Sequence, residues 1–309
     1  MTTATQHHNS DAVIDPDAVV VGHPKRPFKR YFRETGWRHL VGIAMSIFAA
    51  FPLLYVFSAS LNPGGTLVTA NSLFSNFSFQ SYVDLFNRPQ QPYAAWFGNT
   101  LLIGGISSLG TVFLGALAAY AFSRMRFIGR RVGLLTLLLV QMFPQLLAVV
   151  AIFLLLSGIS EIFPAIGLNS QIGLIMVYLG GALGVNTYLM YGFFNTVPSS
   201  IDEAAKIDGA GHARIFFTII LRLVAPILAV VGLLSFVGTT SEFVIASIVL
   251  IDPDKQTLAV GLYQFVSQEF SRNWSIFAAG AVLAAIPVMT LFLFLQKYIV
   301  GGLTAGSVK

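Results

Sequence analysis

Six long apolar runs constrain this chain more than any other feature of its sequence. They cover approximately residues 37–61, 97–123, 132–157, 171–194, 223–251 and 275–299. An α-helix rises 1.5 Å per residue, so about 20 apolar residues cross about 30 Å of hydrocarbon. Only 10% of the residues are charged, whereas soluble domains carry about 25%. The runs therefore predict an all-α polytopic membrane protein with six transmembrane helices.

The distribution of Lys and Arg predicts the orientation of these spans. All 18 Lys and Arg residues except Arg88, Lys255 and Arg272 lie in the N-terminal region, in two loops on the same side, or at the C-terminal end. Cytoplasmic loops of membrane proteins carry an excess of these cations. An even number of spans places both ends on one side, so we expect both termini in the cytoplasm. The outer segments are then 62–96, 158–170 and 252–274.

The same pattern predicts three regions. Residues 1–36 form a cytoplasmic tail that is polar and acidic at first, which is typical of disorder, and then basic. Residues 37–299 form a six-helix membrane domain whose long inner loop covers 195–222, and residues 300–309 form a cytoplasmic C-terminal tail. A signal peptide would carry its cations at the extreme N-terminus, so we expect the helix at 37–61 to be retained.

The sequence offers no sign of enzyme chemistry. It has no cysteine, and the adjacent His7 and His8 lack further ligands, so we expect no metal site. It contains no G-x-x-x-x-G-K-[ST] motif, so any ATP must be bound by another chain. The net charge of +5 follows from basic inner loops and does not indicate nucleic-acid binding. We expect a non-catalytic membrane subunit without a cofactor of its own.

The inner loop contains a short predicted helix with both ends marked. Ser200 can cap its start, and Glu203 three residues later completes a capping box. Asp202 and Lys206 have the spacing of an i, i+4 ion pair, and Gly209 suits the left-handed residue after a helix end. A helix of about eight residues is marginal alone, so it needs a surface to pack on. That surface is either its own bundle or another protein.

This loop carries a family resemblance. Glu203-Ala204-Ala205, Asp208-Gly209-Ala210 and the following Phe216 and Leu221 resemble the EAA loop of permease subunits in binding-protein-dependent ABC importers. In that family the loop forms a coupling helix that docks on a separate ATPase subunit. The resemblance implies that this chain couples to an ATPase through the residues of its own loop that match the EAA loop. These residues are Ser200, Glu203, Ala204, Ala205, Asp208, Gly209 and Ala210.

Further segments are similar to the smaller permease subunit of maltose/maltodextrin importers. They are residues 141–144, 166–169, 178–181, 257–261 and 302–306. The similarity begins near Phe51 and continues to the end of the chain. One departure is Arg222, where the family usually has proline, while Pro226 remains. A cation suits the inner membrane boundary, so we interpret Arg222 as a local variant of the junction between loop and helix.

The resemblance implies a set of partners and contacts. The partners are a second permease subunit, an ATPase dimer that binds ATP and Mg, and an extracytoplasmic sugar-binding protein, at a bacterial or archaeal cytoplasmic (inner) membrane. The substrate would be maltose, maltodextrin or a related oligosaccharide, with trehalose and other glucosides left open. The C-terminal segment would insert between the ATPase subunits, and an outer loop would contact the binding protein. The residues of the tail are Gly302, Leu303, Thr304, Ala305 and Gly306, and those of the outer loop are Asp254, Gln256, Thr257, Tyr263 and Gln264. We expect that the tail does not form a stable helix, because it contains several glycines.

Polar residues inside the runs are candidates for the path of the substrate. Glu242 is the only acidic residue inside a predicted span, and an ionisable group in hydrocarbon should face the bundle interior or water. It could line a path, contact a partner subunit or make a structural hydrogen bond. Asn99, Gln141 and Asn186 could also line a path, although such residues more often bond between helices.

A competing class is a secondary transporter driven by an ion gradient. Such proteins usually show internal repeats and several ionisable residues near the membrane midplane. This sequence offers Glu242 alone and no convincing repeat, which favours the ATP-driven class. A purely structural membrane subunit would leave the marked loop helix without a purpose.

Overall fold

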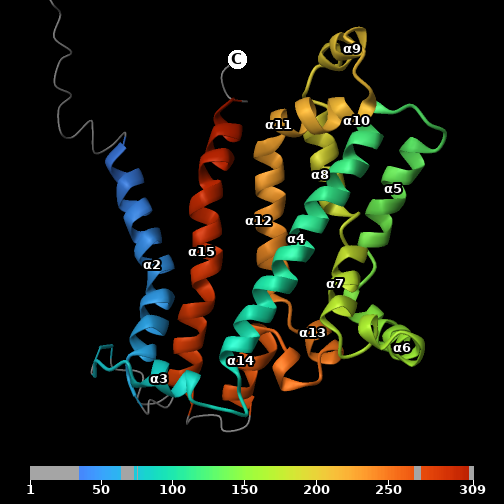
Figure 1. Ribbon diagram of the computed structural model, residues 1–309. Helices are drawn as coiled ribbons and strands as arrows, with labels where there is room; N and C mark the ends of the chain where they lie inside the picture. The colour runs from blue at the N-terminus through green and yellow to red at the C-terminus, as the bar shows by residue number, and fades with distance from the viewer. Residues whose placement is uncertain (1–34, 64–72, 75, 268–272, 306–309) are drawn as a thin grey trace, which may run out of the picture. The chain divides into compact units, whose positions relative to one another are not determined.

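The computed structural model describes residues 35–63, 73–74, 76–267 and 273–305, and all regular structure among them is helical (Figure 1). This confirms the predicted all-α class. The chain divides into two compact units, Met1–Pro52 and Leu53–Lys309. In order, the α-helices are α2 (Trp37–Ser60), α3 (Gln80–Phe86), α4 (Tyr93–Arg124), α5 (Arg130–Gln141), α6 (Gln145–Ile162), α7 (Gln171–Gly180), α8 (Val185–Phe194), α9 (Ser199–Ile207), α10 (His212–Arg214), α11 (Leu221–Leu223), α12 (Ala225–Ser241), α13 (Val244–Val249), α14 (Leu258–Ser267) and α15 (Trp274–Ala305).

Within the described residues, three helices are long and apolar enough to cross a membrane. They are Trp37–Ser60, Tyr93–Arg124 and Trp274–Ile299, and each matches a predicted run to within a few residues. Within the first unit, the apolar side chains of α2 are mostly exposed, with Phe48 at 74%. We expect these apolar side chains to face lipid, because proteins rarely expose so large an apolar surface to water.

The other three predicted runs are interrupted. The run 171–194 becomes α7 and α8, bent by 53°, and the start of α12 meets the preceding helical segment His212–Leu223 at 79°. Counting each bent pair as one span gives up to five. The run 132–157 splits at Pro144 into α5 and α6, and the run 223–251 ends at Ser241 instead of continuing. Helix length alone therefore does not establish six spans, which stay a prediction.

Proline lies at two of these interruptions. Proline removes a backbone donor and clashes with the preceding turn, so α6 begins directly after Pro144. Pro226 lies in the first turn of α12, where proline is tolerated. Arg222 belongs to the three-residue helix α11 just before this corner, and its side chain is exposed. The chain thus turns at Val224 and Pro226 without a proline at position 222.

Helix α4 is the central element of the second unit and packs against α7, α8, α12 and α14. Two of its glycines permit close approach. A β-carbon at Gly104 would lie 2.8 Å from Thr240 Cγ2 on α12, and one at Gly110 would lie 2.5 Å from Leu179 Cδ2 on α7. Small residues at such positions let membrane helices pack closely. These contacts hold α7 and α12 on either side of α4.

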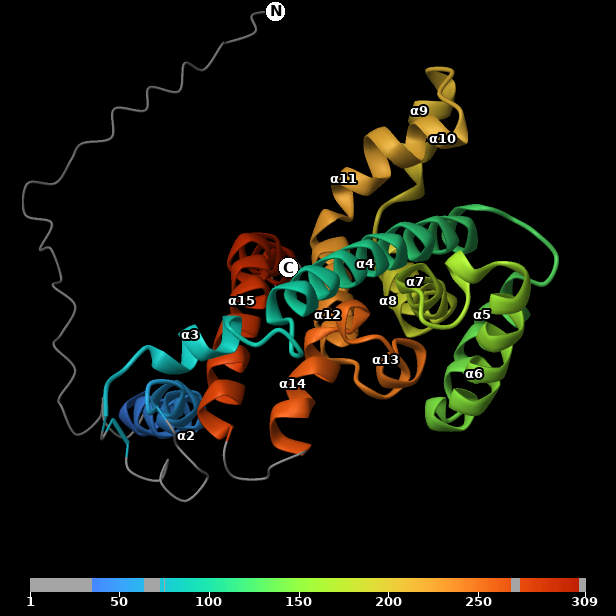
Figure 2. The same cartoon turned by 60° about the horizontal axis from the view of Figure 1, so that its bottom comes forward.

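The loops of the second unit separate into two groups. Helices α9 and α10 lie at one end of this unit, and α6, α13 and α14 lie at the opposite end, which comes forward in Figure 2. Arg124 at the end of α4 contacts Asp202 of α9, so the two inner loops of the prediction meet. Asn169 contacts Asp252, so two of the predicted outer segments also meet. This grouping agrees with the charge distribution of the sequence.

Candidate functional site

The loop helix exists as predicted, but its start differs. Helix α9 begins at Ser199, directly after Pro198, whose side chain makes no capping hydrogen bond. Ser200 is therefore the second residue of the helix, and the predicted capping box between Ser200 and Glu203 is wrong. The physical reason is that Pro198 itself occupies the cap position with a backbone suited to a helix start (φ −58°, ψ 135°). Proline has no side-chain oxygen to offer the free amides.

An ion pair with another helix fixes α9 in place. Arg124 Nε lies 2.9 Å from Asp202 Oδ2, and the two side chains are only 10% and 7% exposed. Arg124 Nη2 also donates a 2.7 Å hydrogen bond to the carbonyl oxygen of Val197. The predicted pairing of Asp202 with Lys206 is therefore wrong: Asp202 faces inward, whereas Lys206 is exposed. Arg124 was not singled out from the sequence, where it is one of several loop arginines.

The end of α9 forms a Schellman motif. The amide of Gly209 donates to the carbonyl of Lys206 at 3.0 Å, and the amide of Ala210 donates to the carbonyl of Ala205 at 2.9 Å. Gly209 has a φ of +77°, which confirms the positive φ predicted for it. A residue with a β-carbon is disfavoured there by sterics. The chain direction after α9 thus depends on this glycine.

Helix α9 has one buried face and one exposed face. Asp202 and Ala205 are buried, and Ala205 packs in a cluster with Ile215, Phe216 and Phe194. The opposite face is exposed over Ser200, Glu203, Ala204, Lys206 and Ile207. Ile207, the last residue of α9, is 87% exposed. The helix therefore packs on its own bundle and still presents a free surface.

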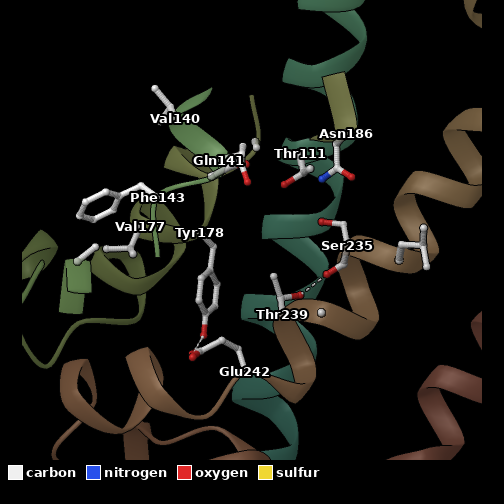
Figure 3. Close-up of a pocket in the computed structure, with 15 residues that line it drawn as sticks. Thr111, Val140, Gln141, Phe143, Val177, Tyr178, Asn186, Ser235, Thr239 and Glu242 are labelled. Atoms are coloured by element: carbon white, nitrogen blue, oxygen red, sulfur yellow. Dashed lines mark hydrogen bonds between the residues drawn. The ribbon is translucent and has the colours of Figure 1, made fainter. Parts of the chain in front are cut away.

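Three of the four candidate path residues line one cavity. It has a volume of about 560 Å³, and Gln141, Asn186 and Glu242 line it together with Tyr178, Thr111, Ser235 and Thr239 (Figure 3). These residues come from α4, α5, α7, α8 and α12 and from the residue that follows α12. Asn99 does not take part. Its Nδ2 donates to the carbonyl oxygens of Asp254 and Gln256, so it holds the outer loop.

Glu242 bridges three elements around this cavity. Its Oε2 accepts hydrogen bonds from Tyr178 Oη at 2.8 Å and from the amide of Ala246 at 2.9 Å, and its Oε1 accepts from the amide of Ile245 at 2.8 Å. Two otherwise unpaired amides of α13 are thereby satisfied. Of the roles left open for Glu242, the structure shows both a structural hydrogen-bond role and a position on the cavity wall.

The outer loop residues divide by exposure. Thr257 and Gln256 are buried, and Gln256 Oε1 accepts a 2.6 Å hydrogen bond from Gln264 Nε2. Asp254 and Tyr263 are exposed, and the ring of Tyr263 packs on Phe243. Contact with a binding protein stays a prediction for all five residues, and the geometry favours Asp254 and Tyr263 as those within reach.

Asn169 is a further structural residue of this end. It adopts a left-handed φ of +57°, which asparagine tolerates better than most residues. Its Oδ1 accepts from the amides of Ile251 and Asp252, and its Nδ2 donates to Asp252 Oδ2 at 2.6 Å. The hydrogen bond from Asn169, followed by that from Lys255, lowers the pKa of the Asp252 carboxyl below its ordinary value. The segment 166–169 gave a family likeness but no indication of this role.

The C-terminal segment differs from its prediction. Helix α15 continues through Gly301 and Gly302 to Ala305, so the expectation that the tail is not helical is wrong up to that residue. Elongating an existing helix avoids the cost of nucleation, and each glycine costs only about 1 kcal/mol relative to alanine. Gly306 and the last three residues lie outside the described residues. A role of residues 302–306 at an ATPase stays a prediction.

Comparisons with known proteins agree with this geometry. Residues 111–304 match the family described as binding-protein-dependent transport system inner membrane component. The chain is 40% identical to the galactooligosaccharides transport system permease protein of Bacillus subtilis (strain 168), covering 91% of this chain and 97% of that protein. It is 39% identical to the maltose/maltodextrin transport system permease protein of Escherichia coli (strain K12), covering 88% and 94%.

A solved structure shares the fold. A chain of a bacterial ABC transporter involved in the import of the acidic polysaccharide alginate matches with a TM-score of 0.72, at 23% identity, covering 89% of this chain and 99% of that chain. The match of the family model over most of the sequence, with relatives aligned over almost their full length, confirms the resemblance found in the loop and membrane segments. The chain belongs to the family of binding-protein-dependent transport system inner membrane components.

Proposed function

We propose that this chain is one of two permease subunits of an ATP-driven oligosaccharide importer in the cytoplasmic membrane of a bacterium or archaeon. A second permease would complete the translocation path, two ATPase subunits would bind ATP and Mg, and an extracytoplasmic protein would deliver the sugar. The identities with galactooligosaccharide and maltodextrin permeases support the sugar class. Both termini and α9 would face the cytoplasm, as the basic loops indicate.

The observation that carries this proposal is the two-faced geometry of α9. One face is fixed to the membrane bundle by the Arg124–Asp202 pair and by Ala205. The other face, with Glu203, Ala204 and Ile207, is exposed and is not covered by any described residue. A helix held rigidly on one side can transmit a displacement applied to its other side. When the ATPase dimer closes, we infer that it moves α9 and that the bundle switches between two states.

The test compares two glycines of the same loop. Gly209 has a φ of +77°, whereas Gly211 has a φ of −74°, and no atom lies near a β-carbon added at either position. Gly209→Val should cost roughly 1–2 kcal/mol in backbone strain and displace the end of α9. Gly211→Val should be tolerated. We expect both variants to accumulate in the membrane and only Gly209→Val to lose co-purified ATPase and ATP-dependent uptake.

The outcome distinguishes this proposal from a purely structural role, in which α9 only packs on its own bundle. If Gly209→Val retains the ATPase and supports uptake as well as Gly211→Val does, α9 does not couple to ATP hydrolysis. Uptake that continues without ATP and stops on collapse of the ion gradients would instead indicate a secondary transporter.

A further inference from the structure

A second pocket, lined by two arginines, lies where the chain passes from α4 into α5. Its volume is about 580 Å³, which lies within the range of small-molecule pockets. Its lining residues are Arg130, Arg131, Phe127, Gly129, Val132, Leu134 and Tyr191, and none of these described residues is acidic. Helix α5 lies at the outer edge of the second unit in Figures 1 and 2 and packs mainly against α8. The pocket is therefore peripheral, and it shares no residue with the cavity around Glu242.

Both arginines have hydrogen-bond donors to spare. Arg130 Nη2 donates a 3.3 Å hydrogen bond to Tyr191 Oη, and the guanidinium carbon of Arg130 lies 5.8 Å from the centre of the Tyr191 ring. Arg131 is exposed, and no described residue forms an ion pair with either arginine. A guanidinium presents a planar fork of donors that matches the oxygens of a phosphate group. The pocket therefore offers positive charge that is partly fixed in place and has no countercharge.

The acidic residues of the neighbouring pocket do not neutralise this charge. Asp202 and Glu203 line that pocket, which Arg130 also borders. Asp202 is already paired with α4, and Arg126 and Lys206 line the same pocket. Cations therefore outnumber carboxylates around Arg130, and an anion brought to it would meet a net positive potential.

An exposed apolar stripe continues from the arginine pocket along α5. Val132, Leu135 and Leu139 have the spacing of one helix face, and each is more than half exposed. Ile128, in the turn before α5, is also fully exposed. Proteins rarely leave such a row of apolar side chains in water, so we expect lipid chains to cover it. Positive charge at one end of an apolar stripe matches an amphiphile with an anionic head.

We propose that this pocket binds the head group of an anionic phospholipid, whose acyl chains lie along the apolar stripe of α5. Arg130 and Arg131 would hold the phosphate group at the end of the bundle that carries the basic loops. Basic pockets between helices on the cytoplasmic side of membrane proteins bind such head groups. The arginines select anionic over zwitterionic head groups, and the stripe selects a lipid over a free phosphate. This site does not depend on the importer function.

The experiment uses the purified full-length chain in detergent micelles, with bound lipid counted by native mass spectrometry. Phosphatidylglycerol and phosphatidylcholine are titrated separately, and glycerol 3-phosphate is added as a soluble competitor. We expect phosphatidylglycerol to be retained at concentrations at which phosphatidylcholine is not, and glycerol 3-phosphate not to displace it. One arginine near a phosphate is worth roughly a fivefold change in affinity. Arg131→Gln should therefore weaken retention roughly fivefold, and Arg130→Gln combined with it roughly 25-fold.

Arg222→Gln is the matched control. It removes an exposed arginine from α11, near the same end of the bundle but outside the pocket, and it should leave retention unchanged. Arg131→Lys keeps the charge and should preserve most of the retention. If variants of Arg130 do not accumulate because the contact with Tyr191 is lost, Arg131→Gln still tests the site, since Arg131 forms no hydrogen bond or ion pair with a described residue.

Four results would overturn the proposal. Retention of phosphatidylcholine equal to that of phosphatidylglycerol would show that the arginines do not select the head group. Displacement by glycerol 3-phosphate at the same concentration as the lipid would indicate a site for soluble phosphates. Equal retention by Arg131→Gln and Arg222→Gln would show that the pocket does not hold the lipid. Loss of co-purified ATPase from the double variant, with lipid retention unchanged, would identify a protein-docking surface instead.

Discussion

The ion pair between Arg124 and Asp202 should decide whether α9 stays on the bundle. Asp202→Ala removes one partner and leaves the Arg124 guanidinium, 10% exposed, without a countercharge. Breaking a buried pair in this way costs about 3–5 kcal/mol. An open pocket lined by Arg126, Lys206 and His212 adjoins the pair. Because solvent can reach the unpaired guanidinium from this pocket, we expect the cost to be at the lower end of that range, about 3 kcal/mol. At about 1.4 kcal/mol per tenfold change, α9 should detach roughly a hundred times more often.

Hydrogen exchange of the amides of α9 in nanodisc-embedded protein measures this opening directly. Asp202→Ala should speed exchange across α9 on the order of a hundredfold while α4 and α12 keep their protection. Glu203→Ala is the matched control, because it removes an exposed carboxylate from the same helix and should leave exchange unchanged. A double variant, Arg124→Met with Asp202→Leu, should regain most of the protection, since an apolar pair can replace a buried ion pair. It should not regain all, because the Val197 carbonyl loses its donor.

Two results would refute this reasoning. If Asp202→Ala changes exchange of α9 by no more than Glu203→Ala does, the pair does not hold the helix. If the double variant exchanges as fast as Asp202→Ala, the loss is not caused by an unpaired charge.

Two further predictions concern the ends of the chain and its loops. Single cysteines at Gln91 and Ser267 should react with an impermeant thiol reagent added to intact cells. A cysteine at Gly211 should not react, because the basic loops face the cytoplasm. External labelling at Gly211 would show that the proposed orientation is wrong. Deletion of Leu303 to Lys309 should leave the membrane bundle folded but lower the amount of ATPase recovered with it, as measured by co-purification, and wild-type uptake by that truncation would show that the segment is dispensable.

Features that depend on neighbouring residues were predicted well from the sequence. Helices α2, α4 and α15 lie where three of the six apolar runs predicted them, because each of these runs is long enough to cross a membrane as a helix. The end of α9 at Gly209 is equally local, since only glycine adopts φ +77° without strain. The family likeness of the inner loop needed no more than its spacing.

Features that depend on distant residues were decided only by the tertiary structure. The pairing of Asp202 was predicted wrongly, because the sequence offered Lys206 one turn away and gave no sign of Arg124, which only folding brings to 2.9 Å. The break at Ser241 depends on what the freed backbone amides can bond, and the amides of Ile245 and Ala246 in α13 bond Glu242. The cavity gathers Gln141, Asn186 and Glu242 and leaves out Asn99, since polarity marks each residue in the sequence but only helix packing determines which of them meet.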